Sequence, residues 1–377
     1  MKIINVFRLL LTLSISLLIS CKHEIEIDFN SFGPNPSGNF TKEESLIERM
    51  NHYKVPGVSI AVVDSGGTMW AKGFGIANTV NGKKVGTETL FQAGSISKPI
   101  AALSVLKLFE EGKVDLDEDV NTYLKDWKIP ENKFTVDQKV SVRRLLTHTA
   151  GVTVHGFPGY RQGDSIPSIQ MILNGEGNTG VIYVDTIPGS TWRYSGGGYT
   201  IIEKLVEDIS GLSFEEYLGV NILRPMGMKN STYEQPLPSD LHASASAAYT
   251  DNGKIIEGLW HNYPEHAAAG LWTTPTDLVK FCIEIQKILS GKTNGVLSRE
   301  TVELMLTKHM NNWGLGVSLE NDHDSLTFGH RGKNAGFTNY MVSFVHKDNT
   351  LVIMANGDNG RELINEIQRS VFNYYQW

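Results

Sequence analysis

Two residues three positions apart, Ser95 and Lys98, have the side chains of a nucleophile and a base. A serine hydroxyl becomes a good nucleophile only when a neighbouring group takes its proton. Pro99 suits the first turn of a helix, so we expect a helix to begin close to Ser95, with Lys98 on the same face. Free backbone N–H groups at such a helix start would stabilise a developing oxyanion. The spacing alone also fits a plain N-cap serine, and Ser104 and Lys107 repeat it in mid-helix without these advantages.

Two further segments could complete such a site. Tyr194 lies in a glycine-rich bend before a helix-like pattern, and a bend of this kind can project a phenol into a cleft. A nearby positive Lys98 would lower the pKa of Tyr194 and favour a phenolate base. His330 and Arg331 stand between glycines and supply hydrogen-bond donors close to flexible backbone. Taken singly, each segment is better explained by a half-buried tyrosine or a structural histidine beside a turn.

The elements that must position these residues are strand-rich at both ends of the chain and helical in the middle. Segments 58–64 and 68–76 read as a hairpin, 337–345 and 351–356 as a second strand pair, and a last helix follows. Capping boxes predict helices at 41–53 and after Ser213. We therefore predict an α/β (α+β) fold, in which one antiparallel sheet from both chain ends is sandwiched between helices beside a mainly α-helical lobe. The site would lie in the cleft between the two lobes.

The N-terminus predicts export. Residues 1–20 combine Lys2 and Arg8 with an apolar run of eleven residues, which is too short to span a membrane. Residues 18–21 end at Cys21 and resemble a bacterial lipobox, in which the cysteine becomes the lipid-bearing first residue. An ordinary secretory signal is the alternative. Residues 21–40 read as a flexible tether and 41–377 as one catalytic domain, and Lys22 favours the outer membrane.

Composition excludes several other classes of protein. The chain has 377 residues, 41% of them hydrophobic, a net charge of −7 and two cysteines. These values argue against disorder, a disulfide framework and nucleic acid as a partner. Cys282 falls in an apolar helical pattern, which predicts a core residue. The GxGxxG match at 175–180 follows a helix-like segment and precedes a strand-like one, whereas a dinucleotide-binding site requires a strand before the glycines and a helix after them. His261, Glu265 and His266 lack zinc-site spacing, so we expect no metal and no cofactor.

Three motifs in order resemble the signature elements of the penicillin-recognising serine hydrolases. They are Ser95-x-x-Lys98, Tyr194-Ser-Gly196 and His330-Arg-Gly332. This family includes class C β-lactamases, serine-type D-Ala-D-Ala carboxypeptidases, esterases and D-amino-acid peptidases. The resemblance extends to segments 145–151, 221–228 and 268–277 and covers essentially all of 41–377, which implies a β-lactamase/transpeptidase-like fold.

The resemblance also implies roles for single residues. Ser95 would be the acylated nucleophile and Lys98 its partner in proton transfer, with Tyr194 as general base. Which of Lys98 and Tyr194 is the operative base stays open. His330 would take the place of the family's Lys or His on the strand beside the cleft, and the backbone N–H groups of Ser95 and Lys333 would form the oxyanion hole. The resemblance implies a structural role for His148.

Two departures from the family's motifs concern the substrate. Gly196 stands where an asparagine is usual, and it has no side chain to bind the lysine or the substrate's amide, so we expect poor β-lactam turnover. Arg331 and Gly332 would line the substrate site, and the Arg331 guanidinium would suit a substrate carboxylate if it points inward. A solvent-facing Arg331 is the equal alternative.

Together these features predict a lipid-anchored serine hydrolase of the bacterial cell envelope, held at the outer membrane through Cys21. It would cut an ester, amide or peptide bond of a small molecule or short peptide through an acyl-enzyme on Ser95. The alternative is a binding lipoprotein that keeps this fold without turnover. Oligomeric state stays open at this stage.

Overall fold

The computed structural model describes residues 46–377 except 66–68, 294 and 323–324. The predicted signal segment, the lipidation at Cys21, the tether and the capping box at Thr41 lie outside the described residues. In the described part of the chain, no helix is long and apolar enough to cross a membrane.

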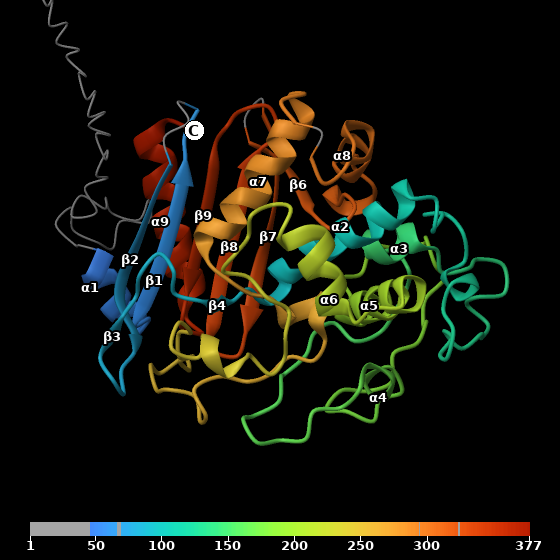
Figure 1. Cartoon of the computed structure of the whole chain (residues 1–377), viewed down its shortest axis with the longest axis horizontal. Helices are drawn as coiled ribbons and strands as arrows, with labels where there is room; N and C mark the ends of the chain where they lie inside the picture. Colours follow the sequence, from blue (N-terminus) through green and yellow to red (C-terminus); the bar gives the residue numbers. More distant parts are fainter. Residues whose placement is uncertain (1–45, 66–68, 294, 323–324) are drawn as a thin grey trace, which may run out of the picture.

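A seven-stranded antiparallel sheet forms the centre of the molecule, with the strand order β3-β2-β1-β9-β8-β7-β6 (Figure 1). The central pairing of β1 with β9 joins the two chain ends, as predicted. The bounds are β1 (Gly57–Val63), β2 (Met69–Asn78), β3 (Lys83–Lys84), β6 (Ser318–Asp322), β7 (Ser325–Asn334), β8 (Phe337–Phe344) and β9 (Thr350–Ala355). A separate small sheet pairs β4 (Phe91–Gln92) with β5 (Trp272–Thr273).

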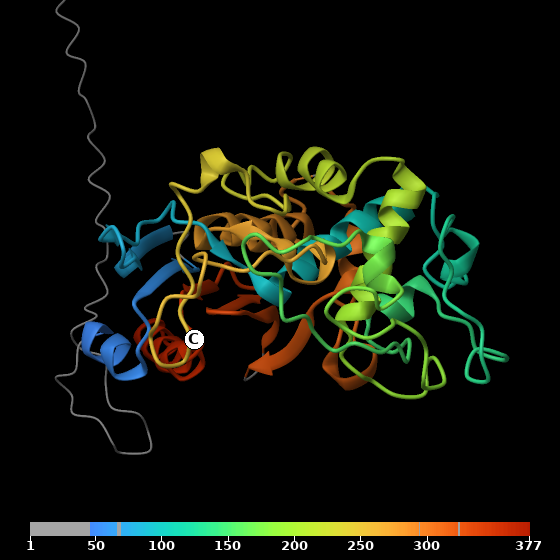
Figure 2. The ribbon, with the colours of Figure 1, turned by 90° about the horizontal axis from the view of Figure 1, so that it is seen from below.

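Helices cover both faces of the large sheet, and Figure 2 shows the resulting layers. On one face lie α1 (Leu46–Tyr53) and α9 (Gly360–Tyr375), and on the other α7 (Pro275–Leu289), which packs on β1 and β9. In α9, the four apolar residues at helical spacing are fully buried, which explains why this helix docks: Leu363, Ile364, Ile367 and Val371. The short α8 (Arg299–Met305) packs on α7.

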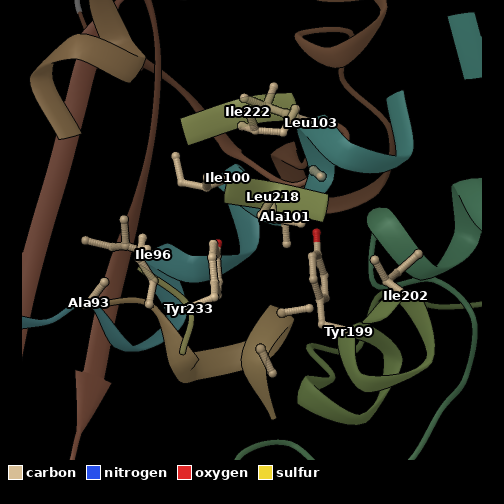
Figure 3. Packing of buried hydrophobic residues seen from close by; sticks show 14 of the residues in the cluster. Ala93, Ile96, Ile100, Ala101, Leu103, Tyr199, Ile202, Leu218, Ile222 and Tyr233 are labelled. Carbon is tan, nitrogen blue, oxygen red and sulfur yellow. The ribbon is translucent and has the colours of Figure 1, made fainter. Parts of the chain in front are cut away.

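The middle of the chain forms the helical lobe, to the right of the sheet in Figure 1. It contains α2 (Ser97–Glu110), α3 (Val142–Leu146), α4 (Ile169–Leu173), α5 (Gly196–Ser210) and α6 (Phe214–Leu218). Buried side chains surround α2 on several sides, among them those of Tyr199 from α5 and Leu218 from α6 (Figure 3). Because α2 is buried on nearly every side, its first turn is held firmly between the lobe and the sheet.

The predicted elements agree with the structure, but the short strands β3, β4 and β5 and two strands at one edge of the large sheet were not predicted. The N-terminal hairpin, the C-terminal strand pair and the last helix are confirmed, and so is the capping box of Ser213 and Glu216 at α6. Strands β6 and β7 were not predicted from the sequence pattern. The residues of β7 include two glycines and two charged side chains, so they do not form the apolar alternation that marks a strand.

Candidate active site

Ser95 lies in a 3₁₀ turn, Gly94–Ile96, that leads directly into α2, so the helix begins where predicted. The Lys98 amino group lies 3.1 Å from the Ser95 hydroxyl oxygen. Ser97 fixes this turn, because its hydroxyl donates to the carbonyl of Gly94 at 2.6 Å and accepts from the N–H of Leu271 at 3.0 Å. Ser95 is therefore held at the start of a rigid helix, within reach of a basic group.

The environment of Lys98 favours its neutral form. Its side chain is buried, and this burial lowers the pKa of Lys98 from about 10.5 to about 7. The amino group donates to the carbonyl oxygen of Ala268 at 2.8 Å and lies 5.0 Å from the ring centre of Tyr194 and 5.5 Å from that of Tyr199. Near pH 7 a large share of Lys98 is uncharged and can accept the Ser95 proton.

Tyr194 precedes the N-cap of α5, where Ser195 accepts a hydrogen bond from Gly198 N–H. Its hydroxyl hydrogen-bonds Ser95 and lies 3.5 Å from Nε2 of His330. Burial raises the pKa of Tyr194 above the ordinary value, and this effect exceeds the lowering by Ser95. The expectation of a phenolate favoured by Lys98 is therefore wrong, because burial disfavours the charged phenolate.

His330 lies on β7 and faces the same site. Its Nδ1 is 2.5 Å from the backbone carbonyl of Arg331, which can only accept, so Nδ1 carries the proton and Nε2 presents a lone pair to Tyr194. Burial and the nearby Lys98 lower the pKa of His330 to about 3. His330 is thus neutral near pH 7 and orients the Tyr194 hydroxyl.

Two glycines let the end of β7 approach Ser95. A Cβ on Gly332 would lie 1.9 Å from the carbonyl oxygen of Ala93, and one on Gly94 would lie 2.6 Å from the backbone nitrogen of Lys333. Pairing of β7 with β6 stops at Gly329, whereas pairing with β8 continues to Asn334, so the last five residues of β7 present a strand edge here. The backbone of Lys333 therefore lies against the turn that carries Ser95, the two segments predicted to form the oxyanion hole.

Arg331 does not join the site. Side chains alternate along a strand, so Arg331 projects to the face opposite His330, where it is exposed and its guanidinium lies 4.6 Å from the ring centre of Tyr340. The expectation of an inward guanidinium fork is wrong, and the solvent-facing alternative holds. Gly332 lies against Ala93 and Ile96, on either side of Ser95 in the sequence, and can offer a substrate only its backbone.

Gly196 begins α5, and the structure explains why no side chain occurs there. A Cβ would lie 2.9 Å from the ring of Phe157 and 3.0 Å from the carbonyl oxygen of His155. Sequence reasoning missed His155, which lies outside helices and strands, and the role of Ala268, the acceptor for Lys98, which lies in a single π-helical turn. The unusual glycine was the one signal that another segment fills this space.

His148 packs against the ring of Tyr194 and holds the backbone beside it, in agreement with the structural role that was predicted. Its Nδ1 accepts the backbone N–H of Ser195 at 3.1 Å, and its ring centre lies 4.2 Å from that of Tyr194. The side chain is buried, which lowers the pKa of His148 well below its ordinary value. A neutral imidazole thus fixes the bend that carries Tyr194.

The described residues contain no group of three or more His, Cys, Asp or Glu side chains arranged to hold a metal ion. His266 instead pairs with Glu203 at 2.8 Å. Cys282 is fully buried in α7, which confirms its prediction as a core residue.

Comparison with known proteins agrees with this geometry. A family model described as Beta-lactamase matches residues 44–371. The chain belongs to the beta-lactamase family. This beta-lactamase-family chain is 23% identical over 327 residues to PbpX of Bacillus subtilis (strain 168), a protein named as a penicillin-binding protein. The aligned region covers 85% of this chain and 76% of PbpX. It is 22% identical over 323 residues to protein flp of Staphylococcus aureus (strain MW2), and this aligned region covers 83% of this chain and 62% of flp.

Solved structures share the fold of this beta-lactamase-family chain. The octameric penicillin-binding protein homologue from Pyrococcus abyssi superposes with a TM-score of 0.69 at 25% identity, over 83% of this chain and 72% of that one. D-amino acid amidase from Ochrobactrum anthropi SV3 gives a TM-score of 0.70 at 22% identity, over 87% and 97%. The predicted β-lactamase/transpeptidase-like fold and the predicted family of penicillin-recognising serine hydrolases are confirmed.

Proposed function

We propose that this protein hydrolyses an ester, amide or peptide bond through a covalent acyl-enzyme on Ser95. The observation that carries the proposal is the 3.1 Å contact between the Ser95 hydroxyl and the amino group of Lys98, whose pKa burial lowers to about 7. A nucleophile beside a base that is partly neutral at physiological pH is what acyl transfer requires.

In acylation, neutral Lys98 accepts the Ser95 proton while Oγ bonds to the substrate's carbonyl carbon. The backbone N–H groups of Ser95 and Lys333 stabilise the oxyanion. As the bond to the leaving group breaks, Tyr194 gives that group a proton, and Lys98 returns a proton to Tyr194. Water then attacks the acyl-enzyme and gives a proton to Lys98, which passes it to Ser95 as the ester bond breaks.

The site favours acyclic substrates over β-lactams in this proposal. The open edge of β7 at residues 330–334 can hydrogen-bond an extended amide or peptide backbone. Gly196 gives no amide side chain at the start of α5. Because a structural neighbour is a D-amino acid amidase, D-amino acid amides are the first substrates to test.

Labelling of Ser95 tests the catalytic proposal. A biotinylated fluorophosphonate should add one adduct per wild-type chain, seen by intact mass, and none to Ser95→Ala. Hydrolysis of p-nitrophenyl acetate, a D-amino acid amide and nitrocefin should then rank the substrate classes. No adduct on wild-type protein would overturn the proposal. An adduct without turnover of any substrate would instead support the alternative, a binding protein of this family.

The proposed location is the cell envelope, with lipid on Cys21 as the membrane anchor and the outer membrane as the site. It rests on the apolar run and lipobox-like residues 18–21. Cells grown with an alkyne fatty acid should label the wild type in the membrane fraction, and Cys21→Ala should lose the label. An unlabelled wild-type protein would contradict the anchor.

A further inference from the structure

The segment 153–157 fills the space beside the start of α5 and adds a side chain to the site. Its Phe157 ring and its His155 carbonyl oxygen occupy the positions nearest to a Cβ on Gly196. Residue 196 can therefore offer a substrate nothing but backbone. A side chain that contacts the acyl part of a substrate on this side of Tyr194 must come from another segment.

Hydrogen bonds fix segment 153–157 against α5. The N–H of Gly196 donates to His155 O and that of Gly197 to Val154 O, both at 3.0 Å, while the Ser195 hydroxyl donates to Thr153 O at 3.0 Å. Val154 has a φ of +61°, a conformation that β-branched residues rarely adopt. Such strain persists where the surroundings impose it, and it is concentrated at functional sites.

This backbone presents the His155 imidazole beside Tyr194. The two ring centres lie 5.1 Å apart, and His155 is exposed, whereas Tyr194 is half-buried and His330 is buried. Within the described residues, no group hydrogen-bonds the His155 ring. Its two nitrogens are thus available to donate and to accept. The ring centre of His330 lies 6.0 Å from that of Tyr194, so both histidines lie close to the residue whose hydroxyl contacts Ser95.

We propose that His155 is a specificity-determining residue that hydrogen-bonds an amide or amine next to the reacting carbonyl. The favoured acyl group is then an α-amino-acyl or N-acyl-α-amino-acyl group rather than a plain alkanoyl group. This inference rests on the proposed function, because it needs an acyl-enzyme on Ser95. It adds a substrate class and a residue outside the three motifs.

Two esters that differ only in the α-substituent test the inference. They are the p-nitrophenyl esters of N-acetyl-phenylalanine, in whichever configuration reacts faster, and of 3-phenylpropanoic acid. His155→Ala should lower kcat/KM for the first about 10- to 100-fold, the loss expected for one hydrogen bond to a substrate, and change the second less than about twofold. His155→Gln, which keeps a donor and an acceptor, should restore much of the loss. His346→Ala, at an exposed histidine in the turn between β8 and β9, is the matched control and should change neither.

The outcomes separate this inference from the proposed function. If wild-type protein is not labelled at Ser95 by the fluorophosphonate, the proposed function fails. If wild-type protein is labelled and His155→Ala has the kcat/KM of wild type on both esters, the His155 inference alone is wrong. An equal loss on both esters would show that His155 merely supports Tyr194, which also overturns the inference.

Discussion

At the scale of single residues, the protonation of Lys98 controls whether Ser95 can react. Lys98 loses its proton as the pH rises through about 7, because burial lowers its pKa to that value. Acylation should therefore become about tenfold faster per pH unit below pH 7 and level off above about pH 8. His330, with a pKa of about 3, stays neutral throughout and adds no second step. The rate of the p-nitrophenol burst between pH 5.5 and 9 measures this profile.

Lys98→Met is the control for this profile. It keeps a side chain of similar length without a base, so the burst should be at least about 10²-fold slower and should lose the step near pH 7. A wild-type profile that is flat from pH 6 to 8 would contradict the role of Lys98. So would a step that persists in Lys98→Met.

The Tyr194 hydroxyl gives a second prediction at this scale. Tyr194→Phe keeps the ring that packs against His148 and removes the group that contacts Ser95 and His330. We expect kcat/KM for a D-amino acid amide to fall about 10²- to 10³-fold, because the amine leaving group loses its proton donor during acylation, while the urea midpoint changes little. Steady-state hydrolysis of the amide measures the loss, and a kcat/KM within threefold of wild type would refute the role.

The sequence could predict which residues meet but not their protonation. The spacing of Ser95 and Lys98 follows from helix geometry and is local. The pKa of Lys98 depends instead on burial by distant segments, including the π-helical turn that carries Ala268. The same burial keeps Tyr194 protonated, which reversed the expectation of a phenolate. His155 lies in a loop whose conformation no local pattern encodes.

At the scale of elements, the site depends on how closely β7 approaches the turn before α2. Gly332→Ala would place a Cβ 1.9 Å from the Ala93 carbonyl oxygen, so strand and turn must separate. We expect kcat to fall at least about 10²-fold, because the Lys333 N–H leaves the oxyanion hole, and the free energy of unfolding to decrease by about 1–3 kcal/mol. Steady-state kinetics and urea unfolding measure the two effects.

Gly180→Ala is the matched control, since a Cβ there meets nothing within 4 Å. Its kcat should equal that of wild type, and its stability should stay within about 0.5 kcal/mol. Equal kcat values for the two variants would show that the approach of β7 is not needed for catalysis.

Element prediction succeeded where apolar periodicity is strong and failed where the site requires other residues. The strands of the first hairpin and the last helix carry clear apolar patterns and were predicted. Strand β7 includes His330, which faces the site, and Gly332, whose backbone contacts the turn before α2. These residues serve the site and interrupt the apolar alternation of a typical strand. The π-helical turn His266–Gly270 supplies the acceptor for Lys98, and its five residues are too few to show an apolar periodicity.

At the scale of the whole molecule, the two chain ends together build the sheet on which the site depends. Strand β9 lies between β1 and β8, and β8 in turn holds β7 beside Ser95. Sequence patterns predicted that the ends would share one sheet, because both are strand-rich. The register between them follows from packing across the whole chain, which no local pattern contains.

The ion pair between α1 and α9 tests how far stability and catalysis separate in this arrangement. Arg49 donates to both carboxylate oxygens of Glu366 at 2.8 and 2.9 Å, and Tyr53 donates to the same group at 2.7 Å. Glu366→Ala takes this carboxylate from an Arg49 side chain that is only 4% exposed, so we expect the free energy of unfolding to fall by about 2–3 kcal/mol. The pair lies on the face of the sheet opposite α7 and the helical lobe, so kcat of the folded variant should stay within about twofold of wild type.

Urea unfolding measures the free energy of unfolding, and kinetics at urea concentrations well below the transition measure kcat. Glu362→Ala, on the exposed first turn of α9, is the control and should leave both quantities unchanged. If kcat falls in parallel with stability, the helices on this face affect the position of Ser95, and the claim that α1 and α9 contribute to stability alone is wrong.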